Sequence, residues 1–238
     1  MMIKIRTMLF EPMSLRGAKR RSNLFWNGLL RPDVPSGLVM TGDTKVLKHR
    51  QSGSAVREWV DSVVVALILA LFIRTFIIQA FKIPTGSMRL TLIEGDRILV
   101  NKLPYGPKVP FVDFRLPGYS KPKRGDVVVF TYPEDPKRDF IKRLIAIGGE
   151  TVEINNGRIY INGEIVEDPV IRNVYYYNRG AYGGQNQKIV VPEDSFYVLG
   201  DNSGSSKDSR YWGFVPKELM IGKAEVIYWP LNRIRFIK

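Results

Sequence analysis

Two of the side chains most often used in catalysis, Cys and His, are absent or nearly absent from this sequence. The 238 residues include a single His and no Cys. The absence of Cys excludes Cys nucleophiles, Cys-ligated zinc and iron–sulfur clusters. A Ser-His-Asp triad would have to use His49, and the helix of a zinc protease needs two His four residues apart. An enzyme made from this chain would therefore take its base from a carboxylate, a Lys or a bound cofactor.

Ser87 is a candidate nucleophile, since it stands in the short segment PTGSM that follows an apolar run. Pro84 stops a helix, and Gly86 permits a tight turn that would expose the Ser87 hydroxyl. The alternative interpretation of this segment is an ordinary loop that ends a helix.

Lys142 is the candidate base, in the segment FIKRLI at 140–145. On a strand it would point to the same side as Phe140 and Leu144, with Arg143 on the opposite side. Burial among apolar neighbours lowers the pKa of an amine, and a neutral amine can take a Ser proton and return it to a leaving amine. Arg143 cannot do this because guanidinium stays protonated. The alternative is that Lys142 extends to solvent.

A third segment, GDNSGSSKDSRYWG at 200–213, is rich in small hydroxyl and acidic residues directly after an expected strand. Side-chain hydrogen bonds and an ion pair between Asp208 and Arg210 would give this loop a fixed shape. An ordinary well-ordered surface turn is the alternative.

The apolar segment 59–81 is expected to be a transmembrane helix that precedes Ser87. Residues 60–81 would form a helix of about 33 Å, enough for a bilayer core of about 30 Å. Asp61 lies near one end, and Arg74 can extend along its stem toward the headgroups. A buried core helix and an uncleaved secretory signal are the alternatives.

The formal net charge of +13 suggests nucleic-acid binding, but more than half of it comes from the N-terminal quarter. Residues 1–58 carry 11 Lys and Arg against 4 Asp and Glu, and residues 82–238 carry 24 against 18. We therefore expect a basic, mostly disordered tail over 1–58 and no nucleic-acid partner. A start at Met40 is possible, which would make 1–39 a mis-assigned extension.

Short β-branched runs indicate a mainly β fold for residues 82–238. Asn156-Gly157 and Asn162-Gly163 are typical of type I′ hairpin turns. The Tyr-rich and Gly-rich segment 175–187 is expected to be a loop or loose excursion, within a small accessory part at about 152–195. The expected strands are 97–100, 126–130, 151–154, 158–161, 164–166, 196–199 and 224–229.

Taken together, the chain from about Arg57 onward resembles the bacterial type I signal peptidases, membrane-anchored Ser/Lys endopeptidases. Four motifs occur in the family's order. They are an apolar segment leading into PTGSM, then GDRILVNK, then KRGDVVVF with FIKRLIAIGGE, and then GDNSGSSKDSRYWGFVP. The resemblance implies a single transmembrane helix followed by a β-rich catalytic domain.

The resemblance implies a role for each matching residue. Ser87 would be the nucleophile and Lys142 the general base. The Thr85 hydroxyl and the backbone N–H of Ser87 would stabilise the oxyanion, and Ser206 would orient the lysine. Asp208 and Arg210 would support the site.

Further matching positions line shallow apolar pockets that accept small side chains before the cleavage point. They are Phe81, Ile83, Met88, Leu92, Phe140 and Ile141. Four positions depart from the family's usual residues: Leu90, Gly148, Glu150 and Ser203.

The expected function is that of signal peptidase I, which removes signal peptides from exported precursors through an acyl-enzyme. The resemblance places the catalytic domain on the outer face of the plasma membrane and the N-terminus in the cytoplasm, with membrane lipid as a further partner. We expect no cofactor and no metal. The alternatives are a soluble self-cleaving repressor with Ser/Lys chemistry, an anchored β module that binds peptides, and an inactive homologue.

Overall fold

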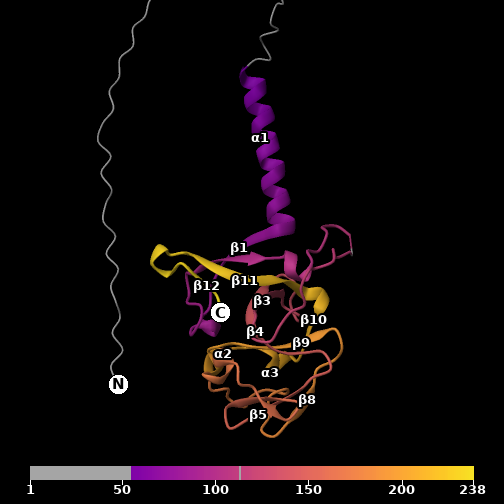
Figure 1. Ribbon diagram of the computed structural model, residues 1–238, viewed down its shortest axis with the longest axis vertical. Helices are drawn as coiled ribbons and strands as arrows, with labels where there is room; N and C mark the ends of the chain where they lie inside the picture. Colours follow the sequence, from indigo (N-terminus) through magenta and orange to yellow (C-terminus); the bar gives the residue numbers. More distant parts are fainter. Residues whose placement is uncertain (1–54, 113) are drawn as a thin grey trace, which may run out of the picture. The chain divides into compact units, whose positions relative to one another are not determined.

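The computed structural model describes residues 55–112 and 114–238 (Figure 1). Helix α1 (Ala55–Phe72) continues as the π-helix η1 (Ile73–Ile77). Over the part of the chain that the structure describes, one helix, Val56–Ile77, is long and apolar enough to cross a membrane. Its mean hydropathy is 2.3, and its apolar stretch is not buried against the rest of the protein. The proposed start at Met40 and most of the expected tail lie outside the described residues.

The expected helix over 59–81 is wrong at both ends. It begins by Ala55, and it ends at Ile77 because strand β1 (Ile78–Lys82) follows at once. Residues of β1 pair antiparallel with strand β2, so their backbone groups are satisfied by the sheet instead of by a further helical turn. Apolar composition alone did not separate these last residues from the helix.

The expected mainly β fold is confirmed by a large antiparallel sheet with the order β1-β2-β11-β3-β4-β9-β10, to which β12 adds by pairing with β11. β11 shifts register against both β2 and β3, and such bulges bend a sheet. The bounds are β2 (Arg97–Asn101), β3 (Val127–Thr131), β4 (Asp139–Ile147), β9 (Ser195–Leu199), β10 (Val215–Pro216), β11 (Met220–Trp229) and β12 (Arg235–Phe236).

Strand β3 separates two apolar clusters of this sheet. Val127 and Val129 belong to the cluster that contains Met88, whereas Val128 and Phe130 belong to the cluster that contains Leu144. Both faces of the strand are therefore covered, which explains why its sequence is continuously apolar.

A smaller sheet has the order β7-β6-β5-β8 and is accompanied by the short helix α2 (Pro169–Arg172). Asn156-Gly157 and Asn162-Gly163 have positive φ at both positions, as type I′ turns require. The core of this sheet includes Tyr197 of the larger sheet, so the two sheets share an apolar cluster. The bounds are β5 (Thr151–Asn155), β6 (Arg158–Ile161), β7 (Glu164–Ile165) and β8 (Lys188–Val190).

Replacing Ile154 by Ala tests whether this shared cluster stabilises the domain. Ile154 is 2% exposed on β5, so the truncation should lower the free energy of unfolding by about 2–5 kcal/mol. The matched variant Ile165→Ala, on β7 where the side chain is 40% exposed, should change it by no more than about 0.5 kcal/mol. Urea unfolding of the full chain in detergent measures both, and equal losses would contradict the assignment.

Candidate active site

Ser87 lies in a single turn of 3-10 helix, η2 (Gly86–Met88), just beyond β1. Ile83 closes the approach to this turn, because its N–H donates to the carbonyl of Asp96 (2.8 Å) and its carbonyl accepts from the N–H of Gly95 (2.9 Å). Ser87 is only 8% exposed, so the residue is more enclosed than the expected open turn, although it lines the pocket described below.

Asn202 holds the Ser87 turn from the opposite side. Its backbone N–H donates to the carbonyl of Ser87 (3.0 Å), and its side-chain amide donates to the carbonyl of Gly86 (2.9 Å). Residues 115 positions apart are thereby joined at the candidate nucleophile. Nothing in the local sequence pattern pointed to this contact, because it depends on where the 200–213 loop folds back.

Lys142 is buried on β4 beside Ser87, which excludes the alternative of an amine extended to solvent. Its Nζ lies 2.8 Å from Oγ of Ser87 and donates to the carbonyl of Ile141 (3.0 Å). The side chain is 4% exposed, and Nζ lies 5.4 Å from the ring centroid of Phe140. The alternation expected on this strand is confirmed, because Phe140 and Leu144 pack in one cluster and Ile141 packs in the other.

Burial lowers the pKa of the Lys142 amine to about 8, against the opposing effect of the carboxylates of Asp208 and Asp201. Desolvation disfavours the charged form of an amine, and these carboxylates are not close enough to offset it. About a tenth of the amine is therefore neutral at pH 7, far more than for an ordinary Lys, and the neutral form is the one that can accept a proton from Ser87.

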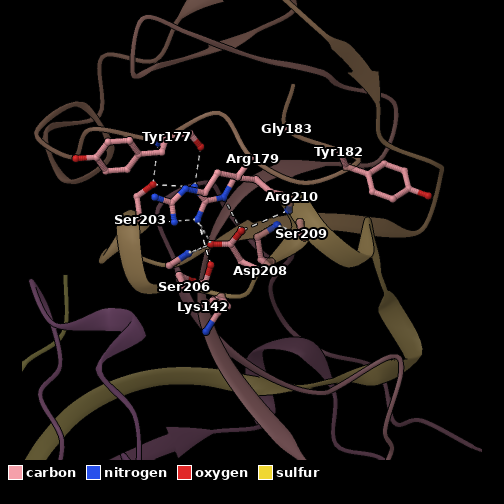
Figure 2. Close-up of polar contacts among 12 residues, drawn as sticks. Lys142, Tyr177, Arg179, Tyr182, Gly183, Ser203, Ser206, Asp208, Ser209 and Arg210 are labelled. Atoms are coloured by element: carbon pink, nitrogen blue, oxygen red, sulfur yellow. Dashed lines mark hydrogen bonds and ion pairs between the residues drawn. The ribbon is translucent and has the colours of Figure 1, made fainter. Parts of the chain in front are cut away.

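The 200–213 loop has the fixed shape expected of it (Figure 2). Arg210 and Asp208 form a two-point ion pair, with Nε to Oδ1 at 2.7 Å and Nη2 to Oδ2 at 2.8 Å, and both side chains are fully buried. Asp208 also accepts from the N–H of Gly200 (3.0 Å) and caps helix α3 (Ser209–Trp212). The alternative of an ordinary surface turn is therefore wrong.

The Tyr-rich segment 175–187 contains neither helix nor strand, which confirms the expected loop, but its hydrogen bonds show that it is not loose (Figure 2). Arg210 donates to the carbonyl of Tyr177 (2.8 Å) and to the hydroxyl of Ser203 (2.9 Å), which in turn accepts from the N–H of Tyr177 (3.0 Å). The N–H of Tyr182 donates to the carbonyl of Arg210 (2.9 Å). Ser203, one of the departures from the usual family residues, thus joins this segment to the Asp208–Arg210 pair.

Ser206 is buried close to the dyad, but the expected hydrogen bond to Lys142 is not formed. Among residues 55–112 and 114–238 its hydroxyl has no hydrogen-bond partner. Its side chain packs against Gly200, where a Cβ would come within 2.2 Å of the Ser206 hydroxyl and 2.6 Å of the Ser87 carbonyl. The absence of a side chain at Gly200 therefore makes room for the Ser206 side chain.

A pocket of about 250 Å³ opens onto the two reactive groups. Thr85, Phe140 and Ile141 line it together with Ser87 and Lys142. The other four expected pocket residues do not line it, because they pack in the apolar cluster that Ile141 also contacts. These four are Phe81, Ile83, Met88 and Leu92.

A second buried ion pair, between Arg143 and Asp201, lies on the opposite face of β4 from Lys142. Nε contacts Oδ1 at 2.8 Å and Nη2 contacts Oδ2 at 2.7 Å, and Thr91 donates to the same carboxylate. Sequence reasoning placed Arg143 on this face but assigned it no partner. The available signal was a charged side chain alternating with apolar ones on a buried strand, which requires a counter-ion.

No cluster of three or more His, Asp or Glu side chains within the described ranges is arranged to hold a metal ion.

Replacing Asp201 by Ala should leave the Arg143 guanidinium buried without a counter-ion. Breaking a buried pair in this way costs about 3–5 kcal/mol of stability. The matched variant is Glu94→Ala, which breaks the exposed pair of Arg89 and Glu94 and should have little effect. Thermal unfolding of both full-length variants provides the comparison, and the prediction is wrong if the two variants unfold alike.

Comparison with known proteins identifies the family of the chain. The family model "Signal peptidase, peptidase S26" matches residues 56–229. A signal peptidase I of Leptolyngbya laminosa is 38% identical over 191 residues, covering 77% of this chain and 85% of the relative. Relatives of the same name from Pseudomonas fluorescens (33% identical, 82% and 80% covered) and Aquifex aeolicus (35% identical, 73% and 84% covered) are also similar. The chain therefore belongs to the signal peptidase family, peptidase S26, and the expected activity, signal peptidase I with serine endopeptidase chemistry, is confirmed.

Proposed function

We propose that Ser87 and Lys142 form the catalytic dyad that removes signal peptides from exported precursor proteins. The observation that carries this assignment is the 2.8 Å separation of Nζ and Oγ in a buried setting that lowers the pKa of the amine. Proximity at hydrogen-bond distance and a base whose pKa lies near the working pH are the two requirements of a Ser nucleophile activated by an amine.

In the proposed reaction, neutral Lys142 takes the hydroxyl proton as Oγ of Ser87 attacks the carbonyl carbon before the scissile bond. The tetrahedral intermediate collapses to an acyl-enzyme, and the ammonium of Lys142 returns the proton to the leaving amine. Water then attacks the ester with Lys142 again as base, which releases the new carboxyl end and restores the Ser87 hydroxyl.

The proposed oxyanion donors are the backbone N–H of Ser87 and the hydroxyl of Thr85. Both residues line the pocket that contains Oγ, which supports the assignment. Donors of this kind act on charge that develops in the transition state, and each contributes about 10²–10³ in rate.

The rest of the site would hold the dyad in place and limit what it accepts. Asp208 and Arg210 are proposed to fix the loop that carries Asn202 and Ser206 against the Ser87 turn. Phe140 and Ile141 wall the pocket directly, and the cluster beneath would limit its depth. A shallow pocket excludes large side chains by overlap, which favours substrates with small residues before the cleavage point.

We propose the same cellular arrangement that the family resemblance implies. The apolar helix 56–77 would anchor residues 82–238 as the catalytic domain on the outer face of the plasma membrane, with the N-terminus in the cytoplasm. Residues 41–59 carry four Lys and Arg and residues 82–100 carry three, a difference that favours this orientation slightly. Lipid would then be the domain's second partner.

Substitution of either dyad residue tests the assignment. Ser87→Ala and Lys142→Arg should each lower kcat/KM by about 10³-fold or more, because the two groups act as one unit. Ser120→Ala and Lys188→Met, at surface positions away from the pocket, should retain activity. Cleavage of a precursor with an Ala-x-Ala site, followed in detergent by mass spectrometry, measures all four; activity surviving in either dyad variant would refute the proposal.

The proposed base also predicts a pH dependence. The neutral amine is the active form, so kcat/KM should rise about tenfold per pH unit at acidic pH and level off above the pKa of about 8. Increasing the exposure of Lys142 through Phe140→Ala should move this rise to higher pH, since burial is what lowers the pKa. A profile that is flat from pH 5 to pH 9 would contradict the role of Lys142.

A further inference from the structure

Lys102 donates hydrogen bonds to backbone carbonyls at the end of the apolar helix. The chemistry of the dyad does not require this contact. Its Nζ donates to the carbonyls of Arg74 (3.2 Å) and Thr75 (3.1 Å), and its backbone N–H donates to the carbonyl of Ile77 (2.9 Å). The last carbonyls of a helix have no partner within it, and leaving them unpaired next to lipid is costly. One residue thus supplies donors to three of the final carbonyls of η1.

The position of Lys102 in the fold makes this contact rigid. It follows β2 directly, and β2 lies between β1 and β11 in the larger sheet. The preceding residue, Asn101, is held by a hydrogen bond to Glu225 of β11 (3.1 Å) and pairs with Ile78. The amine therefore ties the helix end to a strand that is itself paired on both sides.

The nucleophile lies a short distance downstream of the same junction. Between Ile77 and the Ser87 turn the chain passes through β1, which within the described part of the chain is an edge strand that pairs with β2 alone. Five strand residues span about 16 Å. The offset between the helix end and Ser87 is thus set by how the helix meets β2.

We propose that Lys102 is a positioning residue that fixes the helix on the sheet and thereby sets which precursors are cut, according to the spacing between their apolar segment and their cleavage point. This inference rests on the proposed dyad and anchor. A precursor held in the same bilayer presents its scissile bond at a distance from the lipid that its own spacer determines. A fixed offset of Ser87 accepts a narrow range of spacers, and a loose junction accepts a wider one.

Lys102→Met, which keeps the aliphatic stem and removes the donors, tests this in the full chain reconstituted in phospholipid vesicles. The substrates are precursors with one apolar segment, one Ala-x-Ala site and spacers that vary by single residues. The wild type should cleave one spacer length with a higher kcat/KM than the others, and Lys102→Met should reduce the ratio of kcat/KM between the best and the other spacers at least about fivefold. The same variant should cleave a short soluble peptide in detergent with a kcat/KM within about twofold of wild type. Cleavage of the soluble peptide depends on Ser87 and Lys142 but not on the position of the helix. It therefore distinguishes an incorrect dyad assignment from an incorrect role for Lys102.

Two variants serve as controls. Lys102→Arg keeps donors that can reach both carbonyls and should preserve the spacer preference. Lys223→Met removes a neighbouring lysine that pairs with Asp126 instead of with the helix, and it should also preserve the preference. An unchanged preference in Lys102→Met, or a parallel loss of peptide cleavage, would overturn the proposal.

A measurement independent of activity completes the test. Because the chain contains no Cys, the substitutions Trp59→Cys and Lys121→Cys give two unique sites for spin labels. The distribution of distances between the labels should be at least about twice as wide in Lys102→Met as in the parent or in Lys223→Met, since a helix end held by fewer bonds samples more orientations. Lys102→Gln, which cannot reach both carbonyls, replaces Lys102→Met if that variant does not accumulate. Equal widths would overturn the inference.

Discussion

The contact between Lys142 and Ser87 imposes the main physical constraint on this protein. An amine must be kept in an apolar setting, 2.8 Å from a hydroxyl, without a carboxylate close enough to restore its charge. Burying an amine costs free energy of folding, so favourable interactions elsewhere in the structure have to offset that cost. β4 does this by carrying Lys142 between apolar residues and by pairing with β3 and β9 on its two sides.

The two buried ion pairs can be understood from the same constraint. Arg143–Asp201 lies on the opposite face of β4 from Lys142, and Asp208–Arg210 lies in the loop that also carries Ser206 (Figure 2). Burial lowers the pKa of Lys142, whereas both carboxylates raise it, Asp208 more than Asp201. The Arg210 guanidinium partly offsets the effect of Asp208 at the amine, and its pairing with Asp208 keeps the loop rigid. Rigidity is thus obtained without charging the base.

Local pattern was sufficient to predict much of the fold and part of the site. The strand around Lys142, the two Asn-Gly turns and the Asp208–Arg210 pair follow from alternation, turn chemistry and short spacing. Features that depend on tertiary structure could not be predicted from local sequence. They are the hydrogen bonds from Asn202 to the Ser87 turn, the partner of Arg143, and the change from helix to strand at Ile78. The hydroxyl of Ser206 was assigned to Lys142 by resemblance, yet in the structure it packs against Gly200.

The short path from helix η1 through β1 to Ser87 has a consequence for how the enzyme meets its substrates. With the helix in a bilayer, Ser87 stays within a few nanometres of one surface, and the search for substrate becomes two-dimensional. Tethering enzyme and precursor to the same sheet of lipid raises their effective concentration without any new contact between them. Affinity for the cleavage segment itself can then be weak, which suits a pocket of about 250 Å³.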